Sequence, residues 1–270
     1  MIDVSRHGGL RPVAGFPFSV LASAGLEEQA GMMAARCDRA HRFLSDTLGF
    51  APPFVLLVLS PGDWGGRASH PLYGMPNYAH GNLVIAGELN SFWHGFAGLI
   101  REARPDQMPT LQAVYGTADG AIDLSPFFDL LTVHELAHQF HDQTPYRFPR
   151  RWMEEIFVNL CLHAYVAEVE PDCLQVLETF PRVLAGIAPD RFPHHTLGAF
   201  EALYAGVGPM AYGWYQSRFH VAAKQVYDAG GTSALRRLWD EFVLNDDRLA
   251  VQIATVQSEI ADVLTGWDAE

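Results

Sequence analysis

The chain has 270 residues, of which 49% are hydrophobic and 18% are charged, so it can bury a sizeable core and is not intrinsically disordered. Its formal net charge is −13, from 31 acidic and 18 basic residues. An acidic surface repels phosphate backbones and anionic lipid, so we expect no nucleic-acid partner. No apolar run in the sequence reaches the roughly 20 residues of a membrane-spanning helix, so we expect no membrane partner either.

The cysteines and the amino terminus bear on the cellular compartment. Cys37, Cys161 and Cys173 have no CxxC spacing, and we interpret them as free thiols, with one disulfide as an open alternative. The apolar stretch 16–26 is interrupted by polar residues and glycine, and Asp3 stands where a signal peptide has basic residues. We therefore expect a reducing compartment and a cytoplasmic protein.

The amino-terminal half contains a predicted helix followed by predicted strands. Residues 27–48 carry apolar side chains at helical spacing and end at Gly49, which suits a helix C-cap. The continuous apolar run 54–60 lies between Pro52–Pro53 and Pro61–Gly62 and predicts a buried strand, and 83–86 predicts a second one. The other segments up to residue 125 are predicted as a long loop at 61–80, a helix at 90–103, and a loop or weak strand pair at 105–125.

Two longer helices follow in the middle of the chain. Ser125 as N-cap and Pro126 as first helical residue predict a helix that runs to about Gln143. The stretch 152–170 predicts another helix, which ends before Pro171. The carboxyl-terminal third is predicted as mostly helical, with helices near 172–186, 196–206, 210–229, 232–244 and 247–265.

This order of elements predicts an α+β fold. A small mixed sheet is expected in the amino-terminal half and a mainly helical structure in the carboxyl-terminal half. The corresponding lobes are residues 1–143, which end in the helix that starts at Ser125, and residues 144–270.

The segment His134-Glu135-Leu136-Ala137-His138 matches the H-E-x-x-H pattern. Residues four apart lie one above the other on a helix, so both imidazoles can point at one ion. Zinc accepts imidazole nitrogen and leaves room for water at a catalytic site. Glu135 would stand beside the metal, where a carboxylate can take a proton from water and pass it to a leaving group. The alternative is a pair of buried histidines satisfied by hydrogen bonds, because short patterns also occur by chance.

A catalytic zinc ion needs a third protein ligand. The metzincin extension of the pattern requires Gly at position 141 and His at 144, but the chain has His141 and Thr144, so that class is excluded. A following helix offers two adjacent carboxylates, Glu154 and Glu155. Helix phase alone does not decide between them, because neighbours differ by only about 100°.

In these two segments the sequence resembles the gluzincin zinc metallopeptidases, the broad group of thermolysin and the aminopeptidase-N type enzymes. The resemblance lies in the order of three segments: HELAHQFH, a short proline-containing loop and WMEE. The second gluzincin motif commonly reads W-[LM]-x-E-G; Trp152, Met153 and Glu155 match it, and Ile156 replaces the glycine. The gap after His138 is 155 − 138 − 1 = 16 residues, a little shorter than in the best-known members. The resemblance implies Glu155 as third ligand of one Zn²⁺ per chain.

The resemblance implies further roles. Asn159 follows Glu155 by four residues, where thermolysin-like enzymes have a carboxylate that orients a zinc histidine; a partly exposed helix residue is the alternative. Tyr212, with the small Ser217 five residues later, resembles the tyrosine that stabilises the transition state in the aminopeptidase branch. Tyr215 is the second choice, and ordinary packing is the alternative for both.

His141 and the segment 82–88 are two further candidates for a functional role. His141 continues the ligand face, and we expect it to orient a ligand or anchor the next loop, because a fourth protein ligand would close the site. Residues 82–88 resemble the edge strand that binds substrate in this fold by strand addition, although a core strand has the same pattern.

Together these observations predict a zincin-like (thermolysin-like) catalytic domain, whose two lobes form one catalytic unit. The expected function is a zinc-dependent metallopeptidase that hydrolyses peptide bonds of a peptide or protein substrate by a zinc-activated water, with Glu135 as general base. The alternative is a zinc-binding regulatory or interaction module of peptidase fold with weak or lost activity. Whether cleavage is internal or terminal stays open.

Overall fold

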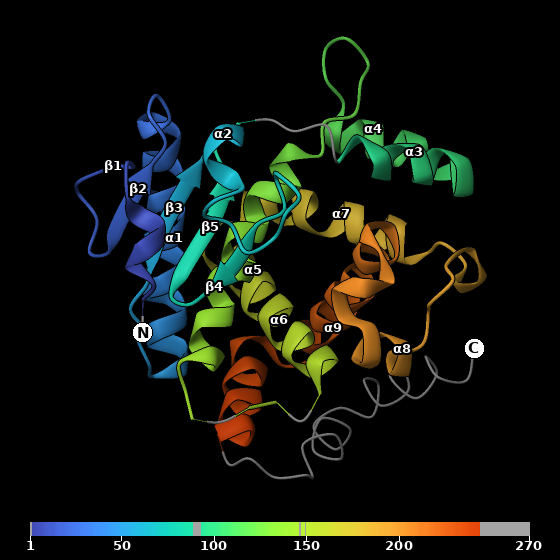
Figure 1. Cartoon of the computed structure of the whole chain (residues 1–270). Coiled ribbons are helices and arrows are strands. Elements are labelled where there is room, and N and C mark those ends of the chain that lie inside the picture. Colours follow the sequence, from blue (N-terminus) through green and yellow to red (C-terminus); the bar gives the residue numbers. More distant parts are fainter. Residues whose placement is uncertain (1, 89–92, 146, 149, 244–270) are drawn as a thin grey trace. The chain divides into compact units, whose positions relative to one another are not determined.

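The computed structural model describes residues 2–88, 93–145, 147–148 and 150–243, with the helices and strands labelled in Figure 1. It divides into two compact units: Met1–Gly95 with Leu124–Thr144, and Phe96–Asp123 with Pro145–Glu270. The predicted α+β character is confirmed. The units differ from the predicted lobes in the segment Phe96–Asp123, and joint action of the lobes as one catalytic unit stays a prediction.

The first unit contains a five-stranded mixed sheet in the order β1-β2-β3-β5-β4. The central strands β2, β3 and β5 are parallel, and the edge strands β1 and β4 are antiparallel to their neighbours. The strand bounds are β1 Arg11–Pro12, β2 Ser19–Ala22, β3 Val55–Leu59, β4 Asn77–Ala79 and β5 Asn82–Ala86. The predicted strands at 54–60 and 83–86 are thus confirmed, and the amino-terminal apolar stretch contributes β2.

Strand β3 is buried along its whole length. Val55, Leu57 and Leu59 pack with Trp64 and with a neighbouring valine of β5 in one apolar cluster. The alternate residues of β3 face the other side of the sheet, where α1 contacts the strand. Because both faces are covered, the strand has a continuous apolar sequence rather than an alternating one.

The expectation that 82–88 form the substrate-binding edge strand is wrong. β5 lies between β3 and β4, so its backbone groups are paired on both sides. The edge on this side of the sheet is β4. The sequence does not indicate β4, because this strand has only three residues and lies in the stretch 61–80, which is predicted as loop. The same stretch also contains the short helix α2 (Pro61–Trp64).

Two long helices pack against this sheet. Helix α1 (Glu27–Leu48) contacts β2 and β3, and helix α5 (Ser125–Asp142) contacts β4 and β5 as well as α1. The predicted glycine cap of α1 is confirmed, since Gly49 has φ 70° and donates its N–H to the carbonyl of Ser45. The N-cap of α5 is Leu124 rather than Ser125, and Pro126 lies in the first turn as predicted.

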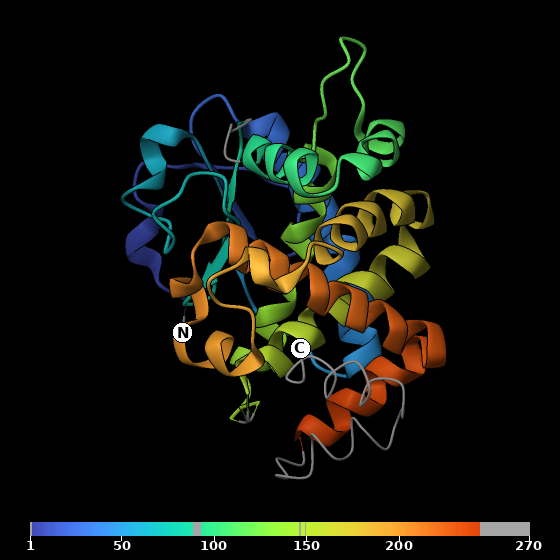
Figure 2. The ribbon, with the colours of Figure 1, turned by 90° about the vertical axis from the view of Figure 1, so that its right-hand side faces the viewer.

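The second unit is mainly helical. Its helices are α3 (His94–Ala103, which begins at the boundary), α4 (Met108–Tyr115), α6 (Arg151–Val169), α7 (Leu174–Ala185), α8 (Leu197–Leu203) and α9 (Pro209–Val243). Helix α9 contacts both α6 and α7, as Figure 2 shows. Its backbone breaks at Gly231 (φ 55°, ψ −152°), where the sequence predicts the junction of two helices. The helix predicted at 247–265 lies outside the described residues.

The prediction of a loop or weak strand pair at 105–125 is wrong. A turn of 3₁₀ helix (Pro105–Gln107) leads into α4, and only an isolated bridge joins Gly116 to Ile122. Tertiary contacts stabilise α4, because the Tyr115 hydroxyl donates to the Val176 carbonyl and accepts from the Phe180 N–H at 3.1 Å. These partners lie more than sixty residues further along the chain, so local patterns do not reveal them.

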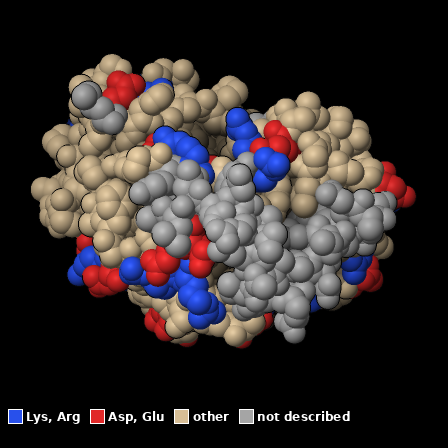
Figure 3. Space-filling model, turned by 90° about the horizontal axis from the view of Figure 1, so that it is seen from below, with Lys and Arg blue, Asp and Glu red and all other residues tan. Residues whose placement is uncertain are grey.

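The three cysteines are free thiols, as predicted, and the surface carries charges of both signs. Cys37, Cys161 and Cys173 are free, and burial raises the pKa of Cys37 to about 12 and that of Cys161 well above its usual value. On the face in Figure 3, most basic side chains lie beside acidic ones. Lys224 and Asp228, one helical turn apart, form an ion pair at 2.6 Å. None of the helices among the described residues combines the length and the apolarity that crossing a bilayer requires.

Two glycines of α1 should respond oppositely to alanine. Gly31 lies inside the helix, with open space where a Cβ would project, so Gly31→Ala should raise the free energy of unfolding by about 0.5–1 kcal/mol. Gly49 is in the left-handed region, so Gly49→Ala should lower it by about 1 kcal/mol. Urea titration measures both changes. Equal effects of the two substitutions would contradict this description of the helix.

Buried His163 should make the stability depend on pH. It lies against His220 and Tyr227, and burial, with a smaller contribution from Lys224, lowers its pKa to about 4. The unfolded chain therefore takes up a proton near pH 6.5 while the folded chain does so only near pH 4. The free energy of unfolding should fall as the pH drops through this window, by up to about 3 kcal/mol from this residue.

Denaturant titrations at pH 7.5 and pH 4.5 measure this effect. His163→Gln should unfold with a smaller difference between the two pH values than the unaltered chain. An unchanged pH dependence in His163→Gln would show that His163 does not carry it.

Candidate metal centre

Helix α5 brings the residues of the H-E-x-x-H pattern together in the first unit. His134 is 5% exposed and His138 is 9% exposed, and Glu135 is half-buried. Each of the three offers one ligand atom, and these atoms lie within 4.8 Å of one another. The spacing of four residues on a regular helix causes this approach, as predicted. The three side chains therefore form a cluster that could hold a metal ion.

His141 contacts this cluster from the next turn of α5. Its Nε2 lies 2.9 Å from Nδ1 of His138, and both rings are buried. If His138 donates from Nδ1, its Nε2 carries the lone pair that a metal ion needs. Ligating histidines usually hold such a hydrogen bond at their second nitrogen. This geometry agrees with the expectation that His141 orients a ligand.

Glu155 occupies a fully buried position on α6 in the second unit. The residue is 0% exposed, and the hydroxyl of Tyr204 donates to its Oε1 at 2.7 Å. Burying an ionised carboxylate is costly unless hydrogen bonds, a positive group or a metal ion compensates it. Its neighbour Glu154 is half-buried. The burial therefore distinguishes Glu155 from Glu154, which helix phase does not.

Asn159 and Tyr212 lie in the same part of the second unit. The Asn159 amide donates to the carbonyl of Glu155 at 2.9 Å and to Oε1 of Gln216 at 3.1 Å. Gln216 in turn donates to the hydroxyl of Tyr212 at 3.0 Å. Asn159 is 3% exposed, so it is not the partly exposed residue of the alternative interpretation. Glu155, Asn159 and Tyr212, which were predicted from separate patterns, thus belong to one group of polar side chains.

The two candidate tyrosines differ in burial. Tyr215 is fully buried, and its hydroxyl donates to the carbonyl of Thr196 at 2.8 Å. Tyr212 is half-buried, and its oxygen accepts the hydrogen bond from Gln216. A tyrosine whose proton is held by a backbone carbonyl in the core is a poor donor to a substrate. The geometry therefore favours Tyr212 over Tyr215.

Sequence reasoning missed two residues of this neighbourhood, Tyr204 and Gln216. Gln216 lies one turn after Tyr212 on α9, and this spacing is a signal that the sequence does contain. Tyr204 ends α8 with φ 49° and ψ −122°, a conformation that no sequence pattern indicates. Its partner Glu155 lies 49 residues earlier in the chain.

The predicted residues thus fall into two groups. His134, Glu135, His138 and His141 lie in the first unit, and the set in the second unit comprises Glu155, Asn159 and Tyr212. Within each unit the residues lie close together. A shared ion that joins Glu155 to the histidines stays a prediction.

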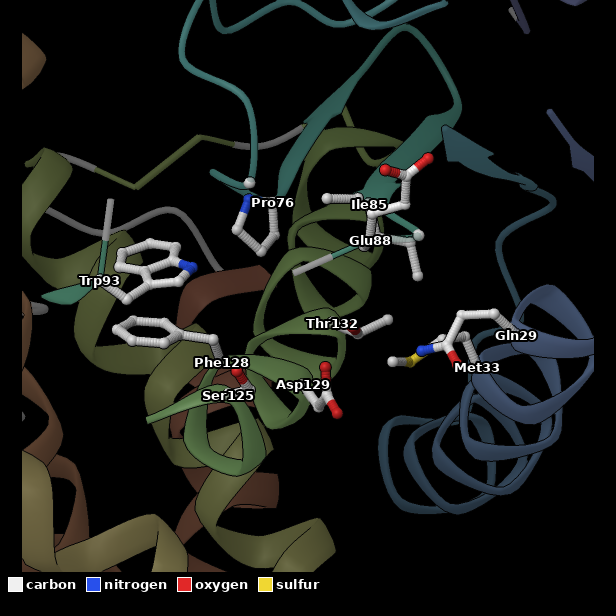
Figure 4. A pocket seen from close by; sticks show the side chains of 13 residues that line it. Gln29, Met33, Pro76, Ile85, Glu88, Trp93, Ser125, Phe128, Asp129 and Thr132 are labelled. Carbon is white, nitrogen blue, oxygen red and sulfur yellow. The ribbon is translucent and has the colours of Figure 1, made fainter. Parts of the chain in front are cut away.

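Residues of α1, β5 and α5 line a cavity of about 220 Å³ in the first unit (Figure 4). Helix α5 lines it with Ser125, Phe128, Asp129 and Thr132. At about 100° per residue these positions lie on the side of α5 opposite to His134 and His138. The Trp93 ring stacks on Phe128 with centroids 3.4 Å apart. This cavity is therefore not the predicted metal site.

Comparison of the chain with models of known protein families, with curated proteins and with solved structures found no match.

Proposed function

We propose that the chain is a zinc-dependent metallopeptidase of thermolysin-like fold that hydrolyses peptide bonds in a peptide or protein substrate. The observation that carries the proposal is the buried cluster on α5, where ligand atoms of His134, Glu135 and His138 lie within 4.8 Å of one another. The resemblance of HELAHQFH and WMEE to the two gluzincin motifs also supports it. The small mixed sheet followed by helices is compatible with it.

The residues fit zinc in their chemistry. Two imidazoles four residues apart, with a buried carboxylate on the following helix, form the N₂O donor set of many catalytic zinc sites. The hydrogen bond between Nδ1 of His138 and Nε2 of His141 orients the His138 ring, which would hold the ion. His134, His138 and Glu155 would be the ligands, and the choice of Glu155 rests on the W-[LM]-x-E-G resemblance and on its burial.

A zinc ion held by these residues would supply a Lewis acid that polarises the scissile carbonyl and makes water more acidic. Glu135 acts as general base, because a carboxylate next to the ligands can take a proton from the attacking water and return it to the leaving amine. The Tyr212 hydroxyl donates to the developing oxyanion. Asn159 and Gln216 hold that tyrosine and the backbone of Glu155 through the hydrogen bonds described above.

Strand β4 is a candidate for binding the substrate backbone. It ends the described sheet and contacts α5, and the Tyr78 hydroxyl donates to Asp142 at the end of that helix at 3.2 Å. An extended peptide can pair with the outer side of an edge strand. The cytoplasmic location and the absence of nucleic-acid and membrane partners also remain predictions from composition.

Zinc content and hydrolysis test the proposal. The purified chain should contain about one zinc per molecule by mass spectrometry, as one metal centre requires. His138→Ala should lose the metal, whereas His94→Ala, at an exposed histidine, should retain it. Glu135→Gln should keep the zinc and lower kcat on a peptide library by about 10²–10⁴-fold, because the general base is removed.

Three results would count against parts of the proposal. Absence of zinc in the unaltered chain would contradict the metal centre. Retained hydrolysis in Glu135→Gln would contradict the assigned base. One zinc per chain without hydrolysis of any library peptide would favour the alternative, a zinc-binding regulatory or interaction module.

A further inference from the structure

Tyr204 adopts a backbone conformation that is costly for a residue with a side chain. Its φ of 49° with ψ of −122° lies outside the regions that L-residues usually occupy. Such a conformation is strained and persists only where the surroundings impose it, often at functional sites. Among the non-glycine residues that the structure describes, only His80 shares a positive φ with Tyr204.

The surroundings of Tyr204 fix its ring from several sides. The Arg151 guanidinium lies 4.8 Å above the ring, and the rings of Phe200 and Tyr212 stand at 5.5 and 5.8 Å. The backbone N–H of Arg151 also donates to the Glu201 carboxylate at 2.9 Å, which joins the start of α6 to α8. The phenol is therefore held by contacts from three elements of the same unit.

The Tyr204 hydroxyl is directed at Glu155. The distance from its oxygen to Oε1 is 2.7 Å, which is typical of a hydrogen bond to a carboxylate. A carboxylate oxygen only accepts, so the phenol is the donor of this hydrogen bond.

We propose that Tyr204 is a positioning residue that fixes the Glu155 carboxylate for zinc binding, with Oε1 held by the phenol and Oε2 as the ligand oxygen. This inference rests on the proposed function. Carboxylate ligands in metal sites are commonly hydrogen-bonded by neighbouring residues, and loss of such a partner weakens metal binding about 10–100-fold. The strained backbone places the phenol, and the carboxylate then needs no reorganisation when the ion binds.

This role differs from that of Tyr212. Tyr204 directs its proton to Glu155, so it is a poor donor to a substrate oxyanion. Tyr204→Phe should therefore weaken zinc binding, whereas Tyr212→Phe should lower kcat and leave zinc affinity within about twofold, because it affects only the transition state.

Competition titration with a chromophoric zinc chelator tests the inference. Tyr204→Phe should bind zinc about 10–100-fold more weakly than the unaltered chain. Tyr227→Phe is a matched control, because it removes another 2.7 Å hydrogen bond from a tyrosine to a glutamate, Glu168, in the same unit. Its zinc affinity should be unchanged.

A double variant separates positioning from a general structural effect. In a Glu155→Ala background the phenol has no carboxylate to hold, so adding Tyr204→Phe should leave zinc affinity unchanged. Should Tyr204→Phe fail to fold, Tyr204→Asn carries the same expectation, because asparagine tolerates positive φ and lacks the phenol.

The possible results are distinguishable. Normal zinc affinity in Tyr204→Phe, or equal losses in Tyr204→Phe and Tyr227→Phe, would overturn the inference and leave the proposed function intact. A further loss in the Glu155→Ala background would also overturn it. An unaltered chain that binds no zinc would overturn the proposed function and the inference with it.

Discussion

Helix α5 buries three imidazoles, those of His134, His138 and His141, and each ring nitrogen removed from water needs a partner. His138 and His141 share one hydrogen bond, and His134 and His138 share a face through their four-residue spacing. A ring nitrogen removed from water needs a partner, and a metal ion can satisfy two rings at once. The helix can meet this requirement because α1, β4 and β5 support it along its length.

In the second unit, the group that is buried and needs hydrogen-bond partners is the Glu155 carboxylate. Glu155 is fully buried, and helices α6, α8 and α9 surround it with side chains that donate hydrogen bonds or position the donors. Tyr204 holds the carboxylate and Asn159 the backbone carbonyl of the same residue. Such an arrangement restricts one carboxylate rotamer, which a stable fold alone does not need. A role as metal ligand would use it, because hydrogen-bonding partners that orient a ligand strengthen metal binding.

The sequence predicts those features that depend on local periodicity. Helix α1 and its cap at Gly49, the buried strand β3, and helices α5 and α6 follow from patterns within single segments. Strand β4, helix α4 and the role of Tyr204 depend on partners far along the chain, so sequence patterns miss them. The ligand spacing in α5 is equally local, whereas the assignment of Glu155 needed a resemblance, because two adjacent carboxylates differ in burial only once the helix is packed.

The central claim is that two histidines and one glutamate bind a zinc ion, and X-ray absorption at the zinc edge tests it most directly. We expect the zinc ion to have a coordination shell of nitrogen and oxygen atoms at about 2.0–2.2 Å, with the outer-shell signal of two imidazoles. Free cysteines Cys37 and Cys161 are buried elsewhere as neutral thiols, so no sulfur should appear near about 2.3 Å. A sulfur shell, or a spectrum with fewer than two imidazoles, would contradict the account.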